Sequence, residues 1–222
     1  MATDGEQKPI DRVFAELKAK GLVAARRKLA PKKAKWSGNF KAGIFRPRNI
    51  YYNERYSSLD DNLLRFALLH EEGHHTSKQT WKLLVGFVVA GFAFLIYFYL
   101  VGWYSGHPDA NSLNFATVVM AFLSLMSLRA FETPLQEDET RADLHAARTL
   151  IEKVGVENPS VVAMSLLRSL EDMQPDKTSL SYRLKHFIGG GIHPSDMKRV
   201  KAIQELEESM VIEADSDGDP GH

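Results

Sequence analysis

Apolar and polar residues follow different periods in different parts of this chain, and the period predicts the elements. Near the N-terminus four apolar residues recur at helical spacing, which predicts an amphipathic helix over about residues 10–20: Ile10, Val13, Phe14 and Leu17. Residues 40–53 combine β-branched and aromatic side chains with breaks at Gly43 and Pro47, which predicts one or two short strands.

A further helix is expected after Ser57 and Ser58, which offer an N-cap followed by two acids in the first turn. Its apolar positions share one face with two histidines: Leu63, Phe66, Ala67, His70 and His74. Later periodic segments predict helices over about residues 134–154, 161–173 and 195–210. The acidic, Gly- and Pro-containing tail predicts disorder over 212–222.

The central segment is predicted to form a transmembrane hairpin. Leu83 to Tyr104 is 22 residues without a charge, about 33 Å as a helix and enough to cross a bilayer. Residues 110–128 are also uncharged but more polar, so a re-entrant or surface-lying helix is an alternative for them. Residues 105–109 carry no Lys or Arg, whereas the flanks do, so the positive-inside rule predicts an external turn and two cytoplasmic termini.

Charge and composition refine this picture. The 222 residues sum to zero formal charge, but Lys18 to Arg48 holds eleven Lys or Arg and no acid. This segment is predicted to meet anionic lipid head groups, with a solvated basic face as the alternative. No nucleic-acid motif accompanies it, so nucleic acid is not an expected partner. The first 35 residues have no apolar core of a signal peptide, which favours soluble parts that remain cytoplasmic.

The segment from His70 to His74 reads H-E-x-x-H, the helical zinc site of metallopeptidases. Residues at i and i+4 lie on one helical face, so His70 and His74 can bind a single metal ion, and Glu71 is placed to take a proton from a metal-bound water. Glu72 and His75 fit this geometry less well and are expected to be solvated. Because the chain has no cysteine, any zinc site must use His, Asp or Glu.

A catalytic zinc site needs a third protein ligand. Glu139 and Asp143 are the best candidates, since their i, i+4 spacing lets one bind metal while the other hydrogen-bonds a ligand histidine. The alternative is that residues 137–139 form an ordinary solvated acidic helix start.

In three ordered motifs the chain resembles the HtpX-like and CAAX-prenyl-protease-like membrane zinc metalloendopeptidases, which are gluzincins. The motifs are His70-Glu71-x-x-His74, Glu139-x-x-Ala142-Asp143, and His193-Pro194-Ser195 with Arg199. The resemblance implies that Glu139 is the third zinc ligand and that Asp143 supports a ligand histidine. It also implies that His193 and Arg199 stabilise the oxyanion and hold the site. Bacterial members usually have membrane helices before the first motif, and this chain has none.

The fold class expected is mainly α with a small β element, an α+β zincin-like catalytic domain, plus a two-helix transmembrane hairpin. Its expected parts are a basic N-terminal region (1–39), two halves of a peptidase domain (40–80 and 132–211), the hairpin (81–131) and the tail (212–222).

The function expected is that of a membrane-bound endopeptidase with one Zn²⁺, which cleaves misfolded, membrane-associated or peptide substrates with Glu71 as general base. The alternatives are a catalytically silent membrane adaptor with a structural zinc and a di-iron desaturase or hydroxylase. Di-iron chemistry needs about eight clustered histidines, whereas the eight here are scattered. An intramembrane protease would place its motif within a span, but His70 has charged neighbours.

Overall fold

The computed structural model describes residues 7–32, 40–42, 48–76, 91, 134, 136–172 and 194–217. These residues form a mainly helical fold with a small sheet, as expected. In chain order the elements are α1 (Pro9–Ala19), β1 (Lys28–Lys32), β2 (Phe40–Ala42), β3 (Asn49–Asn53), the 3-10 turn η1 (Glu54–Tyr56), α2 (Asp61–Thr76), a helix over residues 136–149 that continues into the π-helical turn η2 (Leu150–Val154), α5 (Pro159–Asp172) and α7 (Asp196–Asp217).

The sheet is mixed, with strand order β1-β3-β2. β1 runs parallel to β3, with Ala30 opposite Tyr51, and β2 runs antiparallel to it. The alternation of β3 buries Ile50 and Tyr52, as expected for a strand with one face on the core. β1 was not predicted, because it contains Pro31, which is tolerated in an edge strand, and lacks an alternating apolar pattern.

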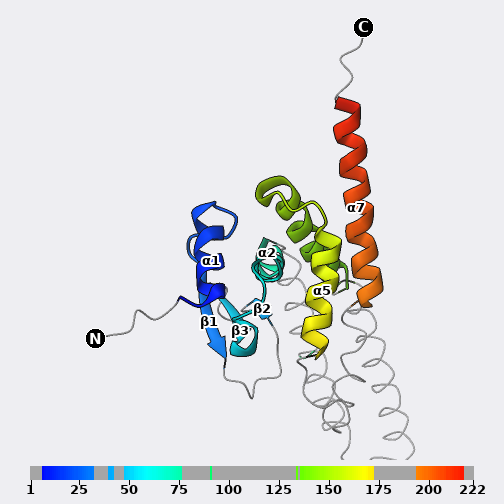
Figure 1. Cartoon of the computed structure of the whole chain (residues 1–222). Helices are drawn as coiled ribbons and strands as arrows, with labels where there is room; N and C mark the ends of the chain where they lie inside the picture. The colour runs from blue at the N-terminus through cyan, green and yellow to red at the C-terminus, as the bar shows by residue number, and fades with distance from the viewer. Residues whose placement is uncertain are drawn as a thin grey trace, which may run out of the picture.

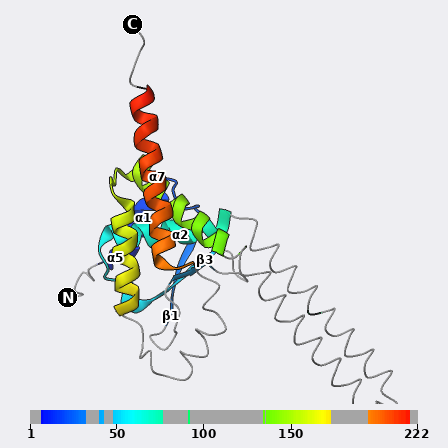
Figure 2. The same cartoon turned by 90° about the vertical axis from the view of Figure 1, so that its right-hand side faces the viewer.

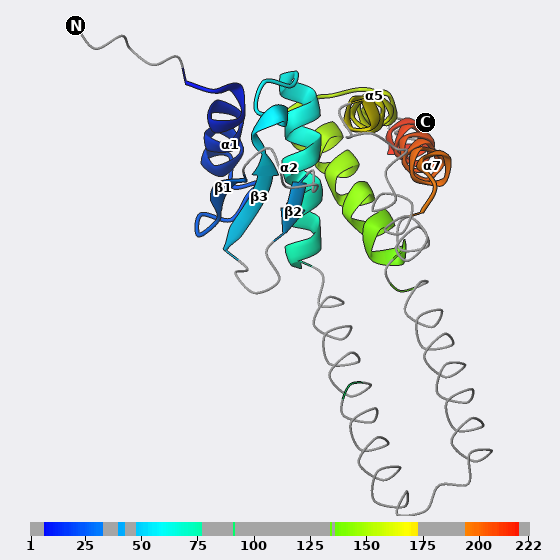
Figure 3. The same cartoon turned by 90° about the horizontal axis from the view of Figure 1, so that it is seen from below.

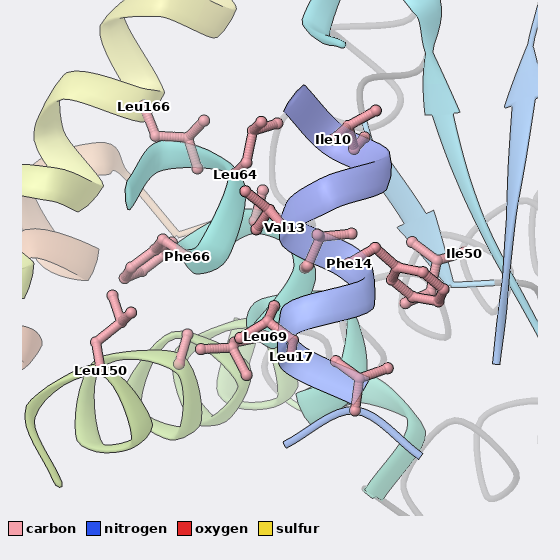
Figure 4. Packing of buried hydrophobic residues seen from close by; sticks show 14 of the residues in the cluster. Ile10, Val13, Phe14, Leu17, Ile50, Leu64, Phe66, Leu69, Leu150 and Leu166 are labelled. Atoms are coloured by element: carbon pink, nitrogen blue, oxygen red, sulfur yellow. The ribbon is translucent and has the colours of Figure 1, made fainter. Parts of the chain in front are cut away.

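Helix α2 is the centre of the molecule. α1 and the sheet lie on one side of it, and the 136–149 helix, α5 and α7 lie on the other (Figures 1 and 3). One continuous apolar cluster joins these layers: it takes Val13 and Leu17 from α1, Ile50 from β3, Leu64 and Leu69 from α2, Ala146 from the 136–149 helix, Leu166 from α5 and Ile203 from α7 (Figure 4). Burial of both flanks fixes the rotation of α2 about its own axis.

The start of α2 differs from the expected one. Its N-terminal cap is Asp60, whose Oδ1 accepts a hydrogen bond of 2.9 Å from the backbone N–H of Asn62. The predicted caps, Ser57 and Ser58, belong instead to the turn that follows η1, where the Ser57 hydroxyl donates to the carbonyl of Glu54. The helix therefore begins at Asp61. Its predicted apolar face is only part of what is buried: Leu64, Leu68 and Leu69 are fully buried as well, because α2 has neighbours on both flanks.

Helix α7 is held in place through α5. Glu207 of α7 accepts hydrogen bonds from the backbone N–H and the hydroxyl of Ser160, at 2.7 and 2.8 Å. A carboxylate thus satisfies donors in the first turn of α5. α7 extends to Asp217, past the predicted end near Met210, and its C-terminal part projects beyond the other helices (Figure 2). The prediction of disorder from residue 212 is therefore wrong as far as Asp217.

Helix α2 and the 136–149 helix approach each other closely at Gly73. A Cβ atom at Gly73 would lie 2.9 Å from the Cα of Ala142 and 3.2 Å from its Cβ. Real side chains do not tolerate such distances to a backbone atom, so only glycine fits there. The backbones of the two helices approach each other because both residues at the crossing are small.

On its opposite flank, α2 is joined to the segment between α1 and β1 by a buried ion pair. Arg27 donates from Nε to Glu72 at 2.7 Å and from Nη2 at 3.2 Å, and the two residues are only 4% and 6% exposed. Glu72 is therefore not solvated, contrary to expectation. Arg27 is equally unavailable to lipid head groups, so the basic segment does not act as one uniform surface.

The predicted membrane spans fall outside the part of the chain that the structure describes, apart from Gly91. Within the described residues, no helix has both the length and the apolarity needed to cross a bilayer. The hairpin remains a prediction.

Replacing Gly73 by alanine tests the helix contact. Helix propensity alone favours alanine by about 1 kcal/mol. Overpacking costs roughly 1–3 kcal/mol, and the upper part of that range is expected here because the clash is with the Cα of Ala142, a backbone atom that cannot turn aside. The free energy of unfolding of Gly73→Ala should therefore fall. The matched control is Gly91→Ala, a helical glycine with nothing within 4 Å of its Cβ position, which should not be destabilised. A Gly73→Ala variant as stable as the wild type would refute the contact.

A second test concerns the buried ion pair. Glu72→Leu leaves the Arg27 guanidinium buried without its carboxylate, which should cost about 3–5 kcal/mol in thermal or denaturant unfolding. Adding Arg27→Met should recover most of this loss, because the doubly apolar pair buries no charge. If the single variant is as stable as the wild type, the pair does not anchor the N-terminal segment.

Candidate metal centre

The last turns of α2 present two imidazoles at one point. His70 and His74 are one turn apart, and their Nε2 atoms lie 3.1 Å from each other. Their rings meet edge to face, with centroids 4.7 Å apart. This is the arrangement predicted from the i, i+4 spacing, and both rings are largely buried.

The 136–149 helix brings Glu139 to the same point, although it lies 65 residues after His74. Its Oε2 is 3.6 Å from Nε2 of His70, and its Oε1 is 3.4 Å from Nε2 of His74. Within the described residues, His70, His74 and Glu139 are the group whose ligand atoms could together hold a metal ion, all within 4.8 Å of one another. The alternative of a solvated acidic helix start is wrong for Glu139.

This group fits a zinc ion. Zn²⁺ binds nitrogen and oxygen at about 2.0–2.2 Å in a tetrahedron, so its ligand atoms should be roughly 3.3 Å apart. The two Nε2 atoms are 3.1 Å apart, and each has one oxygen of the Glu139 carboxylate at a similar distance, 3.6 Å to Oε2 for His70 and 3.4 Å to Oε1 for His74. A set of two histidines and one glutamate is also a known catalytic zinc set, which leaves the fourth position for water.

Asp143 supports His70, in the role that the family resemblance implied for it at a ligand histidine. A hydrogen bond of 2.8 Å joins its Oδ1 to Nδ1 of His70. Because an ionised carboxylate only accepts, Nδ1 carries the proton and the Nε2 lone pair is left for a metal. Asp143 is 1% exposed. Burial acts to raise the pKa of Asp143, but the Arg199 hydrogen bonds and the nearby His70 outweigh it, and the pKa is lowered.

Arg199 extends from α7 to the site and binds Asp143. Its Nε donates to Oδ2 at 2.6 Å and its Nη2 to Oδ1 at 2.7 Å, a two-pronged contact that orients the carboxylate. Burial acts to lower the pKa of Arg199, but the contact with Asp143 raises it overall. The guanidinium thus stays charged and compensates the buried aspartate. His193, the other residue of the third motif, lies outside the described residues.

Asp138 contacts His74, and this contact was not predicted from the sequence. Its Oδ2 lies 2.8 Å from Nδ1 of His74. Burial acts to lower the pKa of His74, but hydrogen bonds to Asp138 and Glu139 and the charge of Glu71 raise it to about 10. The signal was available, since each metal-bound histidine usually needs a partner at its other nitrogen. Only one such partner had been assigned.

Glu71 and His75 are two further polar residues in the last turns of α2, one helical turn apart. Glu71 is buried and close enough to His74 for its charge to raise the pKa of that ring. His75 lies near the Arg27–Glu72 pair, where burial and then the Arg27 charge lower its pKa to about 4, so its ring is neutral at pH 7. His75 does not join the ligand group of the described residues.

Comparison with known proteins agrees with the geometry. The sequence pattern of "Peptidase family M48" matches residues 15–207, which is most of the chain and includes every site residue described above. No curated protein and no solved structure gives a match. Because the family match spans far more than half of the sequence, the chain belongs to peptidase family M48, the family of HtpX-like and CAAX-protease-like zinc metallopeptidases.

Proposed function

We propose that this protein is a zinc-dependent endopeptidase in which His70, His74 and Glu139 hold the ion. The observation that carries the proposal is the convergence of these three side chains, from two motifs far apart in sequence, at separations that suit tetrahedral zinc. When bound there, Zn²⁺ supplies a Lewis acid that makes water more acidic and a peptide carbonyl more electrophilic.

The side chains around the site supply the proton transfers and the positioning. Glu71 takes a proton from the attacking water and delivers it to the leaving amine nitrogen as the peptide bond breaks. Its place next to His70 on α2, close to His74, supports this role. His193 is proposed to stabilise the oxyanion. Arg199 is proposed to hold the site through Asp143, because two of its nitrogens already bind that carboxylate.

We further propose that the enzyme is an integral membrane protein with residues 83–104 and 110–128 as a hairpin. Both termini and the active site then lie on the cytoplasmic side. The contact between Gly73 and Ala142 supports this topology, because the chain leaves and rejoins the domain on two neighbouring helices. A hairpin returns the chain to the side it left. The proposed substrates are unfolded or membrane-associated polypeptides close to that surface.

Glu71→Gln tests the chemistry. The amide cannot accept the proton, so cleavage of an unfolded protein substrate, or of the chain itself, should fall by about 10²–10⁴-fold. Zinc content, measured by atomic absorption, should stay near that of the wild type. Glu137→Gln, an exposed acid on the 136–149 helix, is the control and should retain activity. Unchanged proteolysis in Glu71→Gln would remove Glu71 as the base, and a zinc-loaded wild type without proteolysis would favour a structural zinc adaptor.

Glu139→Ala tests the third ligand. Loss of one of three protein ligands should lower zinc occupancy after dialysis against a weak chelator, and proteolysis should be lost with it. Glu137→Ala serves as the comparison and should retain its zinc. Full zinc retention in Glu139→Ala would mean that another residue is the third ligand.

A further inference from the structure

The two histidines of the metal centre are each backed by a carboxylate from the same helix. His70 has Asp143, as the resemblance to the family implied, and His74 has Asp138. We propose that Asp138 is a positioning residue, which fixes the ring of His74 and thereby sets the affinity of the site for zinc. This inference rests on the proposed zinc site but not on the proposed peptidase activity.

The burial of Asp138 points to a specific role. It lies in the run Glu137-Asp138-Glu139, a composition typical of a solvated helix start, yet it is only 6% exposed. Burial of a carboxylate is unfavourable unless it is hydrogen-bonded. The 2.8 Å contact with His74 supplies that hydrogen bond. Glu137, the preceding residue, is exposed.

The geometry at His74 shows what the contact does. Asp138 binds the ring at Nδ1, whereas Nε2 faces Glu139 at 3.4 Å and His70 at 3.1 Å. Two consecutive residues of one helix therefore hold opposite edges of the same imidazole. With Nδ1 anchored, the ring cannot turn without breaking a charge-assisted hydrogen bond, and Nε2 stays directed at Glu139 and His70.

The spacing of Asp138, Glu139 and Asp143 along the helix allows one carboxylate to support each histidine. At 100° per residue, Glu139 falls between Asp138 and Asp143 on the helical wheel. The ligand thus lies in the middle, with one supporting carboxylate on each side for the two histidines. Asp143 is gripped by Arg199 from α7, so changes at Asp138 leave that second support intact.

The test measures zinc affinity directly, by competition of the purified full chain with a chromophoric chelator. Asp138→Ala should bind zinc about 10–100-fold more weakly than the wild type. Asp138→Asn keeps an oxygen that can accept from Nδ1 and should recover a large part of the loss. Co²⁺ substitution gives a second readout, since a reoriented His74 should change the visible absorption spectrum of the Ala variant and much less that of the Asn variant.

The matched control is Glu137→Ala, which removes the neighbouring acid and should leave both readouts unchanged. If Asp138→Ala binds zinc as tightly as the wild type, or if Asn recovers nothing, the inference is wrong. Should the Ala variant fail to fold, the Asn variant decides alone: an affinity below that of Glu137→Ala but a near-native Co²⁺ spectrum supports the role, and any other result overturns it. A wild-type chain that binds zinc but shows no proteolysis would instead count against the peptidase proposal and leave this inference intact.

Discussion

The structure depends on how closely α2 and the 136–149 helix approach each other. Where the two helices cross, Gly73 lies so close to Ala142 that no side chain fits at position 73. The side chains that meet across this gap are short: aspartate and glutamate must reach imidazoles on the facing helix within hydrogen-bond or ligand distance. A separation larger by the size of one methyl group would carry the carboxylates of Asp138 and Asp143 out of range. The small residues inside the two motifs are therefore as necessary as the ligands.

This approach concentrates negative charge. Four carboxylates gather around the two histidines, from Glu71, Asp138, Glu139 and Asp143. Arg199 binds Asp143 directly and lies near enough to Glu139 for their charges to interact. Such a cluster is costly in a buried place unless cations compensate it. The same excess of negative charge raises the pKa of His74 to about 10, because protonation of its ring adds a positive charge. A divalent metal ion supplies two positive charges instead of one, and it must displace the proton of His74 in order to bind.

Helical periodicity predicts the features that depend on a single segment of the chain. The apolar face of α1 and the convergence of His70 and His74 follow from helical spacing alone. Contacts between distant segments were not accessible in this way. The burial of Glu72 requires Arg27, and the role of Asp138 requires the facing ring of His74. Strand β1 was missed for a related reason: its pairing with β3, rather than its own composition, makes it a strand.

The two variable positions of the H-E-x-x-H motif are not free in this chain. His70 and His74 face the 136–149 helix, and Gly73 permits that helix to come close. Glu72 points to the other flank, where Arg27 ties it to the segment before β1. Helix α2 is thus fixed from two sides, and Glu71 lies between these anchors. The role as general base proposed for Glu71 needs such a fixed backbone, because its own side chain is flexible. In the proposed mechanism all five residues from His70 to His74 are therefore needed: His70, Glu71 and His74 for the chemistry, and Glu72 and Gly73 to hold the helix in place.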